Sequence, residues 1–179
     1  MKRIYLIRHC EAEGQPFEAQ LSERGFRQAV ELTEFFSTFK IDRIISSPFM
    51  RAIQSIQPLA MLLQVPIEEE PRLTERVLSN NNLPDWLEKL SATLDDLDLK
   101  FEGGESSREA MQRIVGVVEE VFVGETENTI IVSHGNLLSL LLKYFNKDFG
   151  FDEWRNLSNP DVFILKSENK TVSIERVWK

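Results

Sequence analysis

The sequence predicts an α/β fold, a three-layer sandwich in which helices flank a mostly parallel central sheet. Short apolar or β-branched runs at residues 4–7, 44–45 and 130–132 are typical of strands buried on both faces of such a sheet. Segments with helical spacing of apolar residues separate these runs, and strand alternating with helix is the order of an α/β sandwich. The 179 residues include 42% apolar ones, enough for a single domain over residues 1–179 with a sizeable core.

Helices are expected at residues 22–39, 49–63, 106–122 and 137–145. The first has apolar residues at helical spacing, namely Phe26, Val30, Leu32 and Phe36. Ser22 is placed to be its N-cap, with Glu23 in the first turn. Pro58 lies inside the second helical segment and is expected to kink or end that helix, because proline lacks the amide hydrogen.

Two stretches close the pattern at the end of the chain. Residues 162–166 and 172–177 alternate in polarity around Asn169 and Lys170, which predicts a hairpin. The segment at about 72–104 fits the α/β order least well, since it holds three consecutive asparagines and only a short expected helix at 85–97. We expect it to be an insertion over one edge of the sheet, and such insertions often line functional sites.

The composition of the chain limits the classes of partner that the protein is expected to bind. The formal net charge of −8 repels polyphosphate backbones and anionic lipid surfaces, which argues against nucleic acid and membrane. The longest strongly apolar segment, residues 137–142, is far shorter than the roughly 20 residues that span a bilayer. The single cysteine, Cys10, cannot form an internal disulfide, and two histidines are too few for a structural zinc site. A cytoplasmic location is therefore expected, without a signal peptide.

Both histidines and two arginines follow the predicted strands. Arg8 and His9 come directly after the first strand, Arg51 follows the second, and His134 follows the third. Each residue alone is more often a hydrogen-bonded structural residue or an ion-pair partner. Together they would meet where the carboxyl ends of parallel strands share one edge, and unpaired charge there is costly. A phosphate-sized dianion would satisfy all four.

These residues also carry a family resemblance. Five segments occur in order along the chain: LIRH at 6–9, LSERGFRQA at 21–29, SSPFMRAIQS at 46–55, GGES at 103–106 and SHGN at 133–136. In this set the chain resembles the histidine phosphatase superfamily, also called phosphoglycerate mutase-like, and specifically its small phosphatases. The resemblance covers almost the whole chain.

The resemblance implies a mechanism. His9 would be the nucleophile that forms a phosphohistidine, while Arg8, Arg51 and His134 would surround the transferring phosphoryl group. By its place after the Pro-Arg-Leu-Thr run at 71–74, Glu75 resembles the family's proton donor.

Further residues are assigned with less direct support. Glu105 is the alternative acid, although its position beside a double glycine better suits a turn or a helix start. Gln15 stands where many members place a phosphate-binding Asn, and Asn136 offers another amide donor or a helix-start residue. Cys10 stands where the family usually has Gly. It is interpreted as a small residue tolerated at a strand end, with an oxidisable thiol beside the site as the alternative hypothesis.

The predicted function is that of a histidine acid phosphatase-type hydrolase. It would hydrolyse a small soluble phosphorylated metabolite without a metal or other cofactor. The alternatives are a cofactor-dependent phosphoglycerate mutase, against which the short insertion argues, and a catalytically silent protein that binds a phospho-ligand. Leu78, Leu83 and Trp86 are candidates for a wall on the leaving-group side, although residues of this kind more often pack in a core or at an edge.

Overall fold

A computed structural model describes residues 1–178 of the chain. Six strands form one sheet: β1 (Lys2–Arg8), β2 (Arg43–Ser46), β3 (Ile67–Glu69), β4 (Asn128–Ser133), β5 (Asp161–Glu168) and β6 (Thr171–Arg176). The helices are α1 (Glu23–Phe36), α2 (Met50–Leu63), α3 (Trp86–Asp95), α4 (Ser107–Val123), α5 (Gly135–Phe145) and α6 (Phe151–Arg155), with a 3₁₀ turn at Pro71–Leu73. The predicted order of strands and helices is confirmed. The sequence prediction missed β3, α6 and the 3₁₀ turn.

The sheet has the order β3-β2-β4-β1-β5-β6. Strands β3, β2, β4 and β1 are parallel to one another, and β5 and β6 add two antiparallel strands at one edge. Asn169 and Lys170 both have positive φ in the turn between β5 and β6, which confirms the predicted hairpin. The sheet is therefore mostly parallel, as the sequence predicts.

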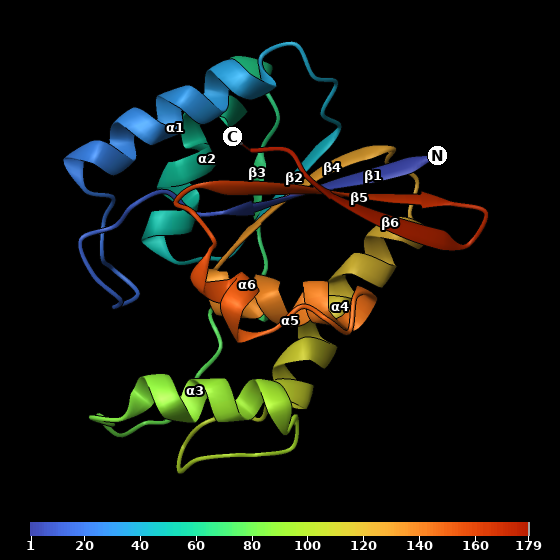
Figure 1. The fold of residues 1–179 in the computed structure, drawn as a ribbon. Coiled ribbons are helices and arrows are strands. Elements are labelled where there is room, and N and C mark those ends of the chain that lie inside the picture. Colours follow the sequence, from blue (N-terminus) through green and yellow to red (C-terminus); the bar gives the residue numbers. More distant parts are fainter. Residues whose placement is uncertain (179) are drawn as a thin grey trace.

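Helices cover both faces of this sheet, so the molecule has three layers (Figure 1). Helices α1 and α2 pack on one face with a core that includes Tyr5, Ile7 and Ile130. Helices α4 and α5 pack on the other face, where Leu6 and Ile131 enter a second core. Alternate residues of β1 and β4 thus pack into the two cores on opposite faces of the sheet, because successive side chains of a strand point to opposite faces.

Helix α1 shows which apolar residues face the core. Ser22 is its N-cap, as predicted, and accepts a hydrogen bond from the Gly25 amide at 3.1 Å. The buried apolar face contains Ala29, Leu32 and Phe36, whereas two residues expected on that face, Phe26 and Val30, are exposed.

The approach of this helix explains the error. A Cβ at Gly25 would lie 2.0 Å from the Glu11 carbonyl oxygen, so the helix approaches the chain on its Gly25 side. Phe26 and Val30 lie beside this face and turn outward.

Two details of the expected elements differ in the structure. The helix predicted at 49–63 is α2, and it continues through Pro58 to Leu63, so of the two alternatives the one in which the proline ends the helix is wrong. The segment at 72–104 does not lie over an edge of the sheet. Its helix α3 lies beyond the α4 and α5 layer (Figure 1), and the Ser107 hydroxyl at the start of α4 donates to the Thr93 carbonyl at 2.6 Å. Leu94 explains the placement, because it is buried in the core that α4 and α5 share.

None of the helices within residues 1–178 combines the length and the apolar character that a membrane span requires.

Candidate active site

The ends of three parallel strands bring the predicted site residues together. In the register of the sheet Arg8 pairs with Ser133, and Ser46 pairs with Val132. His9 and His134 follow these strand ends directly, and their rings meet edge to face with 5.1 Å between centroids. The parallel sheet thus places both histidines of the chain at one edge, as the sequence predicts.

His9 is held in one tautomer. Its Nδ1 lies 2.7 Å from the Cys10 carbonyl oxygen, which can only accept, so Nδ1 carries the proton. Nε2 therefore carries a lone pair, and the Arg51 Nε–H donates to it at 3.2 Å. Burial, together with the positive charges of Arg51 and Arg8, lowers the pKa of His9 to about 3, although the bond to Cys10 acts in the other direction. His9 is consequently neutral at physiological pH, with an unprotonated Nε2.

His134 is fully buried and neutral. Its Nε2 lies 2.8 Å from the Ser47 hydroxyl oxygen, whereas its Nδ1 has no hydrogen-bond partner among residues 1–178. Burial is the main cause that holds the pKa of His134 well below its ordinary value, and the neighbouring His9 and arginines add to it. A buried polar atom without a partner is rare, so we infer that the His134 Nδ1 is reserved for a hydrogen bond to a ligand.

Arg51 and Arg8 are both anchored by backbone carbonyl groups. Arg51 is 1% exposed, and its Nη1 donates to the carbonyl oxygens of Gln15 at 2.9 Å and Pro16 at 3.0 Å. Arg8 Nη1 donates to Leu157 and Ser158 at 3.3 and 3.4 Å. Within residues 1–178, Nη2 of neither arginine takes part in a hydrogen bond or ion pair. Each guanidinium thus keeps free donors for an anion.

Gly135 lets Arg8 approach the start of α5. A Cβ at this position would lie 2.8 Å from Arg8 Nε and 2.9 Å from its Cζ. Any larger residue would displace the guanidinium, because such a contact is far inside van der Waals distance. The SHGN segment therefore fixes both His134 and the position of Arg8.

Glu75 is bound by three backbone amides. Its carboxylate accepts hydrogen bonds from the Asn136 amide at 3.1 Å and the Leu137 amide at 2.9 Å, in the first turn of α5, and from the Arg76 amide at 2.8 Å. The His134 side chain, at the N-cap position, makes no capping bond, so Glu75 supplies the acceptor that the helix start lacks. The carboxylate is therefore held at the first turn of α5, the helix whose N-cap residue is His134.

Glu105 has a structural environment instead. Its two carboxylate oxygens accept from Arg113 Nε at 3.0 Å and Nη2 at 2.8 Å, and the Val77 amide donates at 2.9 Å. Burial acts to raise the pKa of Glu105, but the bonds from Arg113 and Val77 hold it below its usual value. Unlike Glu75, whose partners are neutral amides, Glu105 is held by a charged guanidinium, which disfavours it as the alternative acid.

A cavity of about 580 Å³ opens beside these groups. Its lining residues are Arg8, Gln15, Glu75, Arg76, Leu78, Trp86, Leu90, Asn136 and Trp154. Gln15 and Asn136 thus both line this cavity, and within residues 1–178 the Asn136 Oδ1 is buried without a partner. Leu78 and Trp86 form part of the wall, whereas Leu83 does not belong to it.

The sequence analysis missed Arg76, Leu90 and Trp154 as cavity residues. Arg76 directly follows Glu75, but neighbours in an irregular segment point in directions that the sequence does not reveal. Trp154 belongs to α6, whose five residues are too short to show helical periodicity. A close reading could have flagged only Arg76, as the cation beside the candidate acid.

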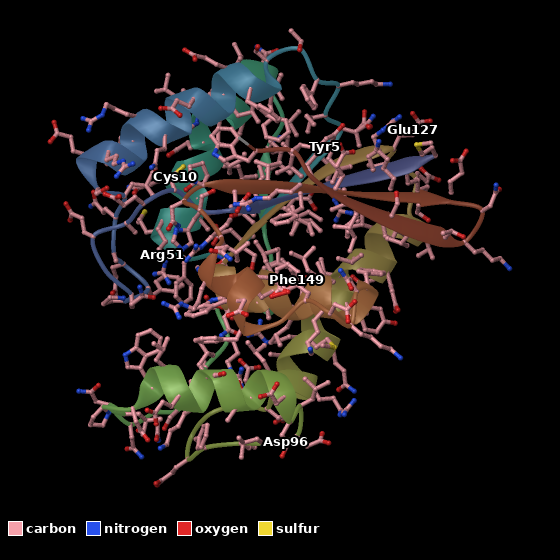
Figure 2. The ribbon with its side chains drawn as sticks, in the orientation of Figure 1. Tyr5, Cys10, Arg51, Asp96, Glu127 and Phe149 are labelled. Atoms are coloured by element: carbon pink, nitrogen blue, oxygen red, sulfur yellow. The ribbon has the colours of Figure 1, made fainter. Side chains whose placement is uncertain are left out.

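Cys10 lies away from the cavity. Its side chain is fully buried in the core beneath α1 and α2, and Figure 2 shows it on that side of the sheet. The Cys10 amide donates to the Ser55 hydroxyl at 2.8 Å, and burial raises the pKa of its thiol to about 12. The hypothesis of an oxidisable thiol beside the site is therefore wrong, because oxidation requires an accessible thiolate. Cys10 is a small core residue after a strand.

We expect Cys10 to be unreactive in the folded protein. An aromatic disulfide reagent at neutral pH should label less than about one tenth of the protein within an hour, since neither exposure nor thiolate formation is available. In guanidinium chloride the same reagent should label one thiol per chain. Rapid labelling of the native protein would contradict the buried position.

Candidate metal ligands do not cluster in the structure: within residues 1–178, no group of three His, Cys, Asp or Glu side chains is arranged to hold a metal ion.

The sequence of this chain is similar to those of known proteins. A family model described as "Histidine phosphatase superfamily (branch 1)" matches residues 4–178. The chain is 28% identical over 147 residues to "Phosphoserine phosphatase 1" of Hydrogenobacter thermophilus, covering 74% of this chain and 70% of that protein. It is also 28% identical over 159 residues to "Probable phosphoglycerate mutase GpmB" of Proteus mirabilis, covering 79% of this chain and 74% of that one.

A solved structure shows the same fold. Mycobacterial glucosyl-3-phosphoglycerate phosphatase in complex with inorganic phosphate superimposes with a TM-score of 0.79 at 23% identity, covering 99% of this chain and 97% of that one. The similarity spans all three layers.

Proposed function

The chain belongs to the histidine phosphatase superfamily, and on this premise we propose that it is a metal-independent phosphomonoesterase that hydrolyses a small phosphate ester through a phosphohistidine on His9. The relatives named as phosphatases support the hydrolytic assignment. The observation that carries the proposal is the state of His9, whose Nε2 has a lone pair while Nδ1 is held by the Cys10 carbonyl.

The first step transfers the phosphoryl group to His9. The lone pair of Nε2 attacks phosphorus, the ester P–O bond breaks, and the leaving oxygen takes a proton from Glu75. Arg8 and Arg51 offer their free Nη2 donors to the phosphoryl oxygens, and His134 offers Nδ1. Donors that are fixed in place before the reaction stabilise the charge that develops in the transition state.

In the second step, water attacks phosphorus and the P–N bond breaks. Glu75 takes a proton from this water, and phosphate leaves with Nε2 restored to its lone-pair form. Gln15 and Asn136 supply amide groups at the cavity wall toward the phosphoryl group. The protein ends the cycle in the protonation state in which it began, so no co-reactant other than water is needed.

The test is phosphate release from an aryl phosphate in excess EDTA, measured over a range from acid to neutral pH. Hydrolysis that persists in EDTA supports the proposal. Hydrolysis that EDTA abolishes contradicts the metal-independent mechanism. If no phosphate is released but phosphoryl groups move between 2- and 3-phosphoglycerate, the mutase alternative replaces the phosphatase.

We expect Glu75→Gln to slow hydrolysis in a way that depends on the leaving group. For an alkyl phosphate, whose leaving oxygen needs a proton, kcat should fall by about 10²- to 10⁴-fold. For an aryl phosphate with a weakly basic leaving group, formation of the phosphohistidine should be much less affected, as a burst of phenol would show. Glu105→Gln is the matched control for the alternative acid. An equal loss in the rate of phosphohistidine formation with both leaving groups would contradict the role of Glu75 as the proton donor.

A further inference from the structure

Ser47 is a polar neighbour of His134, and the phosphoryl transfer described above gives it no role. In the sheet β4 lies between β1 and β2, so His134, which follows β4, has His9 on one side and Ser47 on the other. The Ser47 amide donates to the Val132 carbonyl at 2.9 Å, which continues the parallel pairing of β2 with β4 by one residue. The Ser47 hydroxyl oxygen then lies 2.8 Å from His134 Nε2. The sheet itself therefore fixes this pair of side chains.

The other hydrogen bond of the Ser47 hydroxyl determines which atom of the pair carries the proton. A hydroxyl has one hydrogen to donate and two lone pairs that accept. The Phe49 amide donates to the Ser47 hydroxyl oxygen at 3.3 Å, which occupies one lone pair. Ser47 is fully buried, and among residues 1–178 the His134 Nε2 is the one acceptor within reach of its hydroxyl hydrogen. Because a buried hydroxyl hydrogen without an acceptor is costly, Ser47 donates and Nε2 accepts.

This direction of the hydrogen bond sets the tautomer of His134. A neutral imidazole has a single N–H, and the bond made by one ring nitrogen decides which of the two carries it. Since Nε2 accepts from Ser47, the hydrogen of His134 is on Nδ1. Nδ1 is also the ring nitrogen that has no partner in the described part of the chain. In the opposite tautomer Nδ1 would present a lone pair to the phosphoryl oxygens and repel them, whereas as an N–H it donates to them.

Aromatic contacts hold the plane of the His134 ring, and the bond to Ser47 holds its orientation within that plane. The ring meets His9 and Phe49 edge to face, with 5.1 and 4.9 Å between centroids. The Phe49 ring in turn lies 4.8 Å from the Arg51 guanidinium carbon. A half-turn of the imidazole would place carbon atoms where the two nitrogens are now, and would break the bond to Ser47. Ser47 therefore opposes both the wrong tautomer and the wrong orientation.

A serine beside a neutral histidine also has the composition of a nucleophile and its base. In that arrangement the serine oxygen must reach the substrate. Ser47 is fully buried and is not among the described residues that line the cavity, so its hydroxyl acts on the reaction through His134.

We propose that Ser47 is a positioning residue for phosphoryl transfer: its hydroxyl holds His134 as the Nδ1–H tautomer, which donates a hydrogen bond to the phosphoryl group on His9. This inference rests on the proposed phosphatase function. A donor whose hydrogen is already in place before the reaction stabilises the charge that develops in the transition state without the cost of rearranging. Loss of the Ser47 hydroxyl would remove this advantage while leaving His134 itself in the site.

The first test reads the tautomer directly by NMR. The protein has two histidines, so isotope labelling of the histidine ring nitrogens gives two sets of signals, and His9→Gln leaves only those of His134. In the wild type at neutral pH, Nδ1 of His134 should have the chemical shift of a protonated nitrogen and Nε2 that of an unprotonated one. Inorganic phosphate should move the Nδ1 proton signal downfield as this N–H gains an acceptor. A protonated Nε2, or an Nδ1 signal that stays in place while the His9 signals respond to phosphate, would overturn the proposal.

The second test removes the donor. Ser47→Ala should convert a large share of His134 to the Nε2–H tautomer and lower kcat/KM for an aryl phosphate by about 10- to 100-fold. Ser47→Cys keeps a weak donor of similar size and should give an intermediate result in both measurements. Should Ser47→Ala fail to fold, Ser47→Cys provides the same comparison.

Ser139→Ala is the matched control. Ser139 is also a buried serine, 1% exposed, but its hydroxyl donates to the Gly135 carbonyl at 2.7 Å within α5. This variant loses the same chemical group without touching the His134 ring. It should change neither the tautomer of His134 nor kcat/KM.

The outcomes separate this inference from the proposed function. If folded Ser47→Ala keeps His134 entirely as the Nδ1–H tautomer, or loses activity without a change of tautomer, Ser47 has only a packing role and the inference is overturned. If the tautomer changes and hydrolysis does not, the inference is equally wrong. In each of these cases the phosphatase function of the wild type stands. If the wild type hydrolyses no phosphate ester, the proposed function itself fails, and the positioning role fails with it.

Discussion

Replacing His9 with Ala is expected to reduce phosphate release to background, a loss of at least about 10⁴-fold, because the nucleophile is removed and water must attack the ester directly. The position of His9 suits this role, because its Nε2 carries a lone pair beside Arg51 and its ring contacts His134. The measurement is kcat for an aryl phosphate, with the purified wild type and variant side by side. His9→Gln is a second variant that keeps a polar side chain of similar reach.

The covalent intermediate gives the same prediction a direct readout. A rapid acid quench of the wild type is too harsh for a phosphohistidine, so the reaction should be stopped in alkaline denaturant and the labelled peptide mapped. Phosphate should be found on the peptide that contains His9 and should be absent in His9→Ala. Retained turnover in a folded His9→Ala protein would refute the covalent mechanism.

The pH dependence of the wild type follows from the lowered pKa of His9. Since that pKa is about 3, the nucleophile stays unprotonated throughout the range from about pH 5 to pH 8. We therefore expect no fall in kcat/KM near pH 6.5 from protonation of His9. The same lowered pKa makes stability depend on pH. In the unfolded chain the His9 ring takes up a proton near its ordinary pKa of about 6.5, whereas in the folded protein it does so only near 3. The free energy of unfolding therefore decreases as pH falls from about 6.5 toward 3.

Arg51→Ala is expected to have the second largest effect, a loss in kcat/KM of about 10³-fold or more. Arg51 donates to His9 and keeps a free Nη2, so its removal takes away both orientation of the nucleophile and charge at the transferring group. Its position at the start of α2, near the end of the sheet, can be followed in Figure 2.

Removal of Arg51 also has a cost in stability. The Arg51 side chain is 1% exposed, so its truncation leaves a cavity, and the Gln15 and Pro16 carbonyl groups each lose one donor. Urea unfolding should therefore show a lower midpoint for Arg51→Ala. Arg51→Lys separates the two effects, since it keeps the charge but cannot reach all these partners at once.

Arg27→Ala is the control for Arg51, because Arg27 is exposed on α1 and pairs only weakly with Glu23 at 3.9 Å. It should change neither the activity nor the unfolding midpoint. Full activity in a folded Arg51→Ala protein would refute the assigned role.

Much of the fold was predictable because its signals are local. The apolar runs that form β1, β2 and β4 are buried on both faces, and strands of this kind can be recognised in a sequence as short continuous apolar segments. The errors arose where tertiary contacts override local pattern. Phe26 and Val30 have the spacing of a core face but are exposed, since the close approach at Gly25 determines which side of α1 packs.

The sequence by itself determined the set of chemical groups: both histidines, Arg8, Arg51 and the candidate acid Glu75 follow from strand-end position and from the family motifs. Tertiary structure alone decided how these groups are held. The Arg51 donor on His9, the α5 amides on Glu75 and the burial of Cys10 and Arg76 all depend on contacts between distant segments. Protonation and hydrogen bonding depend on burial and on neighbouring atoms, which linear order does not specify.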